Sequence, residues 1–247
     1  MNKENRLKLF ENELNDIHDE NIRDFAKEVL INADDYFFKV PASSSGKYHP
    51  SFSLGDGGLV RHTRCVVFFA ESIAESFMMS QKDKDLLILA AIAHDIKKQG
   101  DGRTSHTQKL HPKYASDYLT ELDKKYHYVY ADDLEKVKHA VERHMGKWGV
   151  NDGLEAPETE FDKCLQSADY NASRKEILDF NFRETKELTE DTPEDAGNYK
   201  LTFGKHTGKT IKELSVTNPD YLDWILGQPK FNQKECLEQI KKFKNIV

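Results

Sequence analysis

The sequence contains few cysteines and no long hydrophobic run. Its three cysteines, Cys65, Cys164 and Cys236, are far apart and form no Cys-x-x-Cys pair, which argues against a disulfide framework and a cysteine-based metal site. No run of about 18 apolar residues is present, and the first residues lack the apolar core of a signal peptide. We therefore expect a cytoplasmic protein that does not associate with membranes.

Composition and charge indicate two parts. A chain of 247 residues with 38% hydrophobic residues is long enough for one sizeable core and a small second one. Residues 183–198 are acidic and polar and contain Pro193 and Gly197, as is typical of a linker. Residues 199–247 carry nine lysines and five acidic residues, a balance of +4, while the rest of the chain has −11. The predicted domains are 1–182, the acidic linker, and a basic module at 199–247.

Apolar residues recur at helical spacing along most of the first domain. This spacing predicts helices near residues 4–16, 20–35, 59–79, 84–95, 111–125, 132–146 and 159–178. The C-terminal module is expected to begin with a short strand and a Gly-rich turn, followed by short helices. The expected fold class is therefore an all-α bundle with a small α+β C-terminal module.

The pair His94-Asp95 follows the apolar run LLILAAIA, at the C-terminal end of a predicted buried helix. An adjacent imidazole and carboxylate can bind one divalent ion together. His62 begins the apolar stripe of the preceding helix, and Asp169 lies beside the stripe of a later one. Because an unpaired buried carboxylate is costly, Asp169 is expected to have a partner. The four residues together predict a metal centre.

The motifs around these residues resemble the signatures of a known superfamily. GGLVRHT, AHDIKK and SADYNASR occur in this order and look like the three signatures of the HD-domain metal-dependent phosphohydrolases, over roughly residues 20–185. The resemblance implies an HD-domain helical bundle and the metal-dependent hydrolysis of phosphate esters.

Members of this superfamily that bind two metals carry two further histidines. His111 in LHPKYASDYL and His144 in VKHAVERHMGKWG occupy the matching places. With Asp95 as the bridge, two ions about 3.5–4 Å apart could be held, a spacing suited to phosphate-ester hydrolysis. Manganese, iron, zinc, nickel and magnesium all remain open. The implied ligands are His62, His94, Asp95, His111, His144 and Asp169.

The other histidines are not expected to bind metal. His139 lies five residues before His144, about 140° round a helix, and is expected outside the ligand face. His106, in a polar loop, could contact a substrate phosphate or simply be solvated. The remaining histidines, expected outside the cluster, are His18, His49, His127 and His206.

Two basic side chains are candidates for contact with the scissile phosphate. In the resembling family a lysine three residues after the HD aspartate often has this role, which implies Lys98 as a catalytic residue. Several relatives have glycine where this chain has Lys97, so either lysine could face the metals. Arg61 precedes the first ligand and is a second catalytic candidate. The alternative for both is a solvated surface side chain.

The segment before the first ligand bears on the substrate. Residues 38–62 combine Lys47-Tyr48-His49 with a Gly57-Gly58 turn. Similar segments occur in HD proteins related to a bacterial 3′-to-5′ exoribonuclease, which implies a nucleic-acid substrate and makes Lys47 a candidate substrate contact. A helix-entry loop whose glycines relieve backbone crowding is the alternative.

The C-terminal module has a pattern of its own. The string FGKHTGKTIKEL followed by PDYLDWIL resembles the small C-terminal module of exonuclease X-type proteins. Gly204 and Gly208 would let a phosphate approach Lys205 and Lys209 closely. The alternatives are a hairpin turn that its lysines solvate, or a surface for a protein partner. Trp224 is expected in the module core.

These observations predict a metal-dependent phosphohydrolase that acts on nucleic acid, with single-strand 3′-to-5′ exonuclease activity favoured. The acidic first domain argues against broad nonspecific binding to duplexes, while the basic module could recruit a strand. A nucleotidase or dNTP triphosphohydrolase is the alternative enzyme. A nucleotide-sensing or nucleic-acid-binding HD protein without turnover is the alternative outside catalysis, and it would be expected to lack a ligand.

Overall fold

A computed structural model describes residues 1–43, 46–101, 104–178, 196–228, 231 and 233–245. The chain divides into two compact units, residues 1–180 and 181–247. The predicted acidic linker at 183–198 lies outside the described residues except for its last three positions. None of the described helices is both long and apolar enough to cross a membrane.

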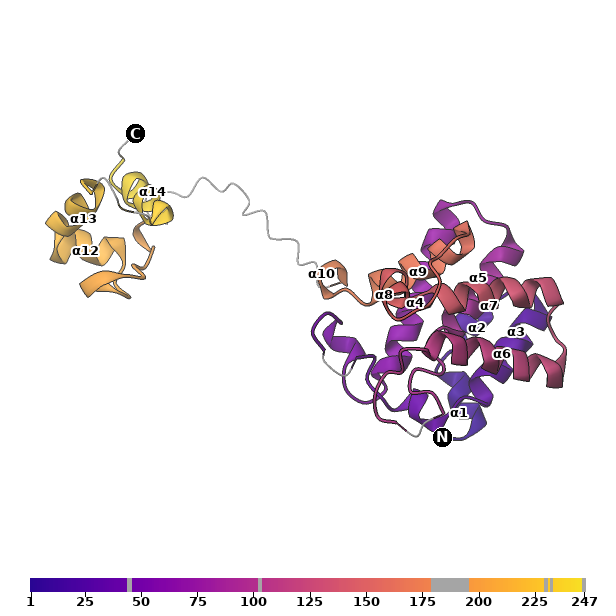
Figure 1. Ribbon diagram of the computed structural model, residues 1–247. Coiled ribbons are helices and arrows are strands. Elements are labelled where there is room, and N and C mark those ends of the chain that lie inside the picture. The colour runs from indigo at the N-terminus through magenta and orange to yellow at the C-terminus, as the bar shows by residue number, and fades with distance from the viewer. Residues whose placement is uncertain (44–45, 102–103, 179–195, 229–230, 232, 246–247) are drawn as a thin grey trace. The chain divides into compact units, whose positions relative to one another are not determined.

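The first unit is built from helices (Figure 1). Two short helices replace the predicted helix at 4–16, because the chain turns at Phe10, whose φ of −122° and ψ of 22° leave the helical range. This turn places the Phe10 ring in the core, where it is fully buried. The α-helices of the unit are α1 (Lys3–Lys8), α2 (Glu11–Asn15), α3 (Glu20–Ile31), α4 (Gly58–Ser76), α5 (Gln81–Ala93), α6 (His111–Tyr126), α7 (Ala131–Arg143), α8 (Lys147–Asn151), α9 (Glu160–Ala172) and α10 (Lys175–Leu178).

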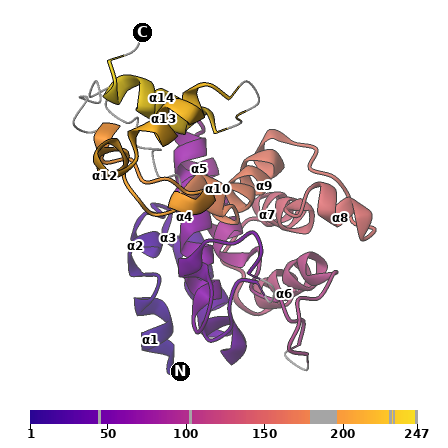
Figure 2. The ribbon, with the colours of Figure 1, turned by 90° about the vertical axis from the view of Figure 1, so that its left-hand side faces the viewer.

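Helix α5 lies beside α4 in the first unit (Figure 2). It packs against α3, α4, α7 and α9, and all its residues from Leu86 to Ala93 are buried. A helix that is apolar on every side is stable only when it is surrounded by protein. Its C-terminal end therefore delivers His94 and Asp95 into the interior of the unit.

The loop before α4 is held close to that helix. Its 3₁₀ helices, η1 (Asp35–Phe38) and η2 (Ser51–Ser53), both pack against α4. At Gly58 a Cβ atom would lie 2.2 Å from the carbonyl oxygen of Ser53, so only glycine fits. This close approach fixes the start of the helix that carries His62.

The second unit has its own small core, and the predicted strand is wrong for its described residues. The segment after residue 199 forms one isolated antiparallel bridge, between Lys200 and Thr210, because the chain turns at once into η3 (Gly204–His206). The helices are α12 (Ile211–Thr217), α13 (Pro219–Leu226) and α14 (Lys234–Phe243). The core residues are Leu201, Ile211, Leu214, Leu222, Ile225, Cys236 and Ile240.

Trp224 does not lie in this core, contrary to prediction. Its side chain is 54% exposed and stacks on Tyr221, with ring centroids 5.6 Å apart. The apolar face of α13 uses Leu222 and Ile225 instead, three residues apart on the helix. The position of Trp224 leaves one face of its indole ring available at the surface.

Candidate metal centre

Five helices of the first unit bring six side chains together. His62 lies in the second turn of α4, and Asp169 lies in α9. His94 and Asp95 directly follow α5, while His144 directly follows α7. The sixth residue, the first of α6, is His111. All are buried except Asp169, whose side chain is 21% exposed.

Asp95 lies in the middle of this cluster, and its two oxygens face different histidines. Oδ2 lies 3.4 Å from Nε2 of His94 and 3.8 Å from Nε2 of His62. Oδ1 lies 2.9 Å from Nε2 of His111 and 3.8 Å from Nε2 of His144. One carboxylate therefore joins two groups of imidazoles, as a bridging ligand between two ions would.

Asp169 completes the first group. Its Oδ1 lies 3.1 Å from Nε2 of His62 and 3.9 Å from Nε2 of His94. Ligand atoms that lie within 4.8 Å of one another can share one ion. Two triplets satisfy this condition, namely His62, His94 and Asp169, and His94, Asp95 and His144.

Backbone carbonyls determine which nitrogen of three imidazoles faces the centre. Nδ1 of His94 lies 2.7 Å from the carbonyl oxygen of Ala91, and His111 and His144 make the same contact at 2.6 and 2.7 Å. A carbonyl oxygen only accepts hydrogen bonds, so each Nδ1 carries the proton. Nε2 is then left with the lone pair that a metal needs.

Charges within the cluster shift the pKa values of its members. Burial opposes ionisation of Asp95, but Lys98, His94 and His111 outweigh it and hold the Asp95 pKa well below its usual value. Burial, together with His94 and His111, lowers the pKa of His144 to about 3. An ionised carboxylate and a neutral imidazole are the forms that bind metal.

Several buried atoms of the cluster have no hydrogen-bond partner among the described residues. They are Nδ1 and Nε2 of His62, Nε2 of His94 and Oδ1 of Asp95. Leaving such an atom unsatisfied costs about 1–3 kcal/mol, and a divalent cation would satisfy the nitrogen and oxygen lone pairs together. The residues present therefore fit a metal ion. Mixed imidazole and carboxylate donors suit transition metals better than magnesium, which prefers oxygen.

The two lysines after Asp95 point to different partners. Lys98 forms an ion pair with Oδ2 of Asp95. Lys97 forms an ion pair with Asp34, 2.7 Å away, and its Nζ lies 4.7 Å from the centre of the Tyr118 ring. Of the two lysines, only Lys98 faces the cluster.

Arg61 has a different position from the one its sequence neighbourhood suggests. Its Nε donates to the carbonyl oxygen of Phe52, and one terminal nitrogen donates to that of Leu54 at 2.9 Å. The guanidinium is thus engaged by the loop before α4. Arg61 holds this loop in the structure, and its contact with phosphate stays a prediction.

His49 lies beside the cluster although it was expected outside. Its ring centroid is 5.6 Å from that of His62, and burial together with His62 lowers its pKa to about 4. The histidine comes from an irregular loop with no periodic pattern, so spacing gave no signal. Its position in Lys47-Tyr48-His49, before the first ligand, was the one available hint.

A cavity of about 210 Å³ opens onto the cluster. It brings together candidate ligands, Lys98 and His49 from five separate segments of the chain. The residues that line it are Ala42, Ser43, His49, Asp95, Lys98, Thr107, His111, His144, Met145, Asp169 and Ser173. This cavity gives a small ligand access to the candidate metal centre.

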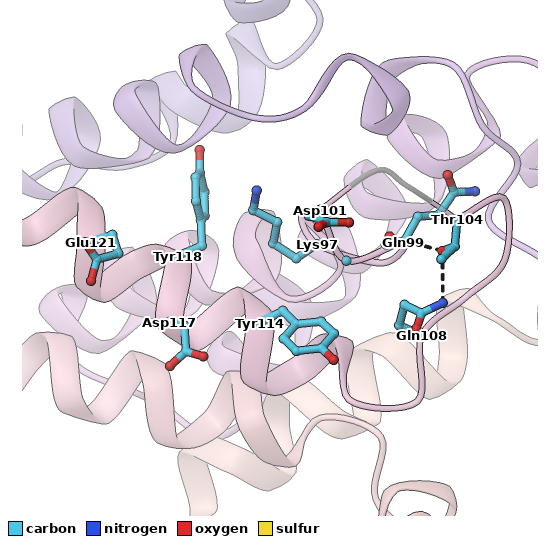
Figure 3. Close-up of a pocket in the computed structure, with 10 residues that line it drawn as sticks. Lys97, Gln99, Asp101, Thr104, Gln108, Tyr114, Asp117, Tyr118 and Glu121 are labelled. Atoms are coloured by element: carbon cyan, nitrogen blue, oxygen red, sulfur yellow. Dashed lines mark hydrogen bonds between the residues drawn. The ribbon is translucent and has the colours of Figure 1, made fainter.

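Figure 3 shows a different cavity, of about 490 Å³, between α6 and the loop after Lys97. Tyr114, Tyr118 and Asp117 line it from the helix, and Thr104 and Gln108 line it from the loop. None of its lining residues is a candidate metal ligand. It is therefore separate from the site of the expected chemistry.

The other predicted substrate contacts lie outside the cluster. Lys47 is exposed, with Nζ 5.1 Å from the centre of the Tyr48 ring. His106 is exposed in the loop before α6, where its carbonyl oxygen accepts a hydrogen bond from Thr104. Lys205 and Lys209 are exposed residues of the second unit.

His139 lies outside the ligand set, as its helical position predicts. Its Nδ1 lies 2.9 Å from Oδ1 of Asp162. Asp162 also accepts hydrogen bonds from the backbone of Glu158 and Thr159, which form the N-terminal cap of α9. His139 thereby links α7 to the helix that carries Asp169.

Comparison with known families agrees with this geometry. The HD domain family matches residues 59–173, and the Exodeoxyribonuclease X-like C-terminal family matches residues 201–229. These matches confirm the two resemblances found in the sequence. HD domains are generally metal-dependent hydrolases that bind divalent ions. No curated protein and no solved structure matches the chain.

Proposed function

We propose that this protein is a phosphohydrolase with a two-metal centre that cleaves phosphodiester bonds in single-stranded nucleic acid. One observation carries the metal assignment: the two oxygens of Asp95 face separate groups of imidazoles, at 3.4 and 3.8 Å on one side and 2.9 and 3.8 Å on the other. A carboxylate placed in this way suits the bridge of a two-metal site.

The proposed ligands divide into two sets that share Asp95. His62, His94 and Asp169 would hold one ion, while His111 and His144 would hold the other. When bound, the metal ions would lower the pKa of a coordinated water and polarise a phosphoryl oxygen. The carbonyl-bound Nδ1 protons of three histidines keep their Nε2 lone pairs directed at the centre.

Lys98 is the proposed catalytic cation. Its Nζ contacts Oδ2 of Asp95, and its side chain lines the same cavity as the ligands. An ammonium group there can hold a phosphoryl oxygen as negative charge grows on it in the transition state. Because Lys98 already lies beside Asp95, its ammonium group needs no large movement to contact a phosphate at the proposed metal centre.

The second unit supports a nucleic-acid substrate. It matches the Exodeoxyribonuclease X-like C-terminal family and exposes Lys205 and Lys209 on either side of its first turn. Trp224 and Tyr221 stack on each other, and Trp224 is 54% exposed. Exposed aromatic rings next to lysines suit single strands, whose bases are free to stack. We propose removal of nucleotides from the 3′ end, with this unit holding the strand.

Product analysis tests the proposal. Manganese-loaded protein would be incubated with end-labelled single-stranded DNA and RNA and with a panel of nucleotides, with Asp95→Ala as the inactive blank. A ladder of products that shortens from the 3′ end is expected. Intact strands with hydrolysed nucleotides would instead assign the protein as a nucleotidase or triphosphohydrolase. No turnover with manganese, iron, zinc, nickel or magnesium would contradict the enzyme proposal.

A further inference from the structure

A cluster of aromatic rings lies beside the metal centre and has no part in holding the metal. Tyr48 comes from the loop before α4, Trp148 from α8 and Tyr170 from α9. Trp148 and Tyr170 stack with ring centroids 5.9 Å apart and planes 23° apart. Their exposed fractions are 48% for Tyr48, 39% for Trp148 and 37% for Tyr170, so each ring keeps a surface that solvent or a ligand can reach.

Arg174 lies among these three rings. Its guanidinium carbon is 4.5 Å from the ring centre of Tyr170 and 5.1 Å from those of Tyr48 and Trp148. Among the described residues no carboxylate forms an ion pair with it, and its buried Nε has no hydrogen-bond partner there. Stacking holds the plane of the guanidinium while leaving its charge free for an anion.

This cluster lines a cavity of about 310 Å³ that reaches the metal centre. The cavity shares His49, His144, Asp169 and Ser173 with the smaller cavity that opens onto the candidate ligands. The backbone of the aromatic wall is also tied together, because Lys175 N donates to the carbonyl oxygen of Tyr48 at 2.9 Å. A ligand in this cavity would therefore lie next to a phosphate at the metals.

We infer that this cavity binds a nucleobase of the substrate strand, which stacks on Tyr48 and Trp148 while Arg174 holds an adjacent phosphate. The inference rests on the proposed function and deepens it, because it states how the strand is positioned at the centre. Flat aromatic surfaces bind bases of any sequence. A guanidinium that pairs with no carboxylate of the described residues complements the phosphate next to the base.

Intrinsic fluorescence tests the stacking directly. The chain has two tryptophans, so Trp224→Phe leaves Trp148 as the single reporter. Metal-free protein in chelator would be titrated with a thymidine oligonucleotide and with an abasic phosphodiester strand of equal length. Quenching by the thymidine strand is expected, with binding about tenfold weaker and no quenching for the abasic strand. Equal binding of the two strands, or saturation without quenching, would overturn the inference.

Substitutions separate the two parts of the site. Tyr48→Ala and Trp148→Ala are each expected to weaken binding of a labelled thymidine strand about tenfold, measured by anisotropy, without changing binding of the abasic strand. Arg174→Gln is expected to weaken the binding of both the thymidine strand and the abasic strand. Tyr130→Ala is the control, since Tyr130 is 76% exposed and lines neither cavity. Loss of binding in the control equal to that in Trp148→Ala would contradict the assignment.

Two further measurements distinguish the inference from the proposed function. Bis(p-nitrophenyl) phosphate is a phosphodiester without a nucleobase or a strand, so its hydrolysis by metal-loaded protein tests the proposed function separately from strand binding. The control Tyr130→Ala, whose residue lines neither cavity, is expected to keep this activity. Failure of the wild-type protein to hydrolyse any ester would contradict the proposed function. The binding of the thymidine and abasic strands by metal-free protein would still show whether the cavity binds a base. Thymidine monophosphate binding as tightly as the strand would overturn the assignment to a strand.

Discussion

Lys98 forms an ion pair with the same Asp95 oxygen that faces His62 and His94. A buried carboxylate that is shared by a lysine and by candidate metal ligands connects the metal centre to the position where substrate charge would develop. Lys97, the neighbouring residue, pairs with Asp34 instead. The two lysines therefore provide a matched pair for experiment.

Replacement of Lys98 by glutamine is expected to lower the turnover number about a hundredfold, because a donor to the developing charge is lost. Lys97→Gln removes the same charge one residue away and is expected to change turnover less than threefold. Steady-state hydrolysis of a phosphodiester under saturating metal measures both. Equal losses in the two variants would show that the effect is structural.

Two ions per chain are expected after metal loading, and His111→Ala is expected to keep only one. His111 lies on the Oδ1 side of Asp95, so the group formed by His62, His94 and Asp169 remains. Metal analysis by mass spectrometry counts the ions. His106→Ala, an exposed histidine five positions earlier, is the control and is expected to retain both. One ion in the wild-type protein would contradict the two-metal assignment.

The raised pKa of Glu71 leads to a prediction for how the free energy of unfolding changes with pH. Burial, aided by Asp16 and Glu13, raises its pKa to about 7. The folded state therefore binds this proton more tightly than the unfolded chain does. Stability falls as the pH rises from the unfolded pKa of about 4.3 through the folded value, because the half-buried side chain must then ionise in the folded state.

Glu71→Gln removes this penalty. The variant is expected to be more stable than the wild-type protein at pH 8 and equal to it near pH 3, where Glu71 is protonated in both states. Urea unfolding followed by circular dichroism over this pH range measures the difference. Glu75→Gln is the matched control, since its carboxylate is exposed and paired with Lys84. A constant difference between Glu71→Gln and wild type would contradict the assignment.

Gly58→Ala is expected to destabilise the first unit by about 1–3 kcal/mol, as overpacking does. The added Cβ would lie 2.2 Å from the carbonyl oxygen of Ser53, so the loop or the start of α4 must move. Thermal unfolding measures the loss. Gly227→Ala is the control, since its nearest neighbour would be at 3.5 Å. An unchanged melting temperature in Gly58→Ala would show that the loop before α4 moves away from the added Cβ at no cost in stability, and would contradict the prediction.

The helices and the positions of His62, His94, Asp95 and Asp169 could be predicted because they depend on local spacing, whereas His111 and His144 followed only from the family resemblance. The apolar run before His94 identifies α5, and that helix ends at Ala93, next to the HD pair. His62 and Asp169 lie on the buried side of their own helices. In each case a short periodic stretch determines where the side chain points, and the bundle then brings these directions together.

The loops could not be predicted in the same way. His49 approaches His62, and Arg61 donates to loop carbonyls, because of the tertiary path of an irregular segment. The predicted strand of the module was replaced by a single bridge at Lys200 and Thr210. The apolar character of Trp224 predicts a position in the core of the module, but Leu222 and Ile225 fill that core instead.

The imidazoles of His94, His111 and His144 are each held by a carbonyl oxygen three residues earlier in the chain. The hydrogen bond that leaves Nε2 free to bind metal therefore lies within four consecutive residues at each position. No side chain from elsewhere in the bundle takes part in these three contacts. The chemistry of the centre is in this sense insulated from its surroundings, which leaves the walls of the adjoining cavity free to determine what is brought to it.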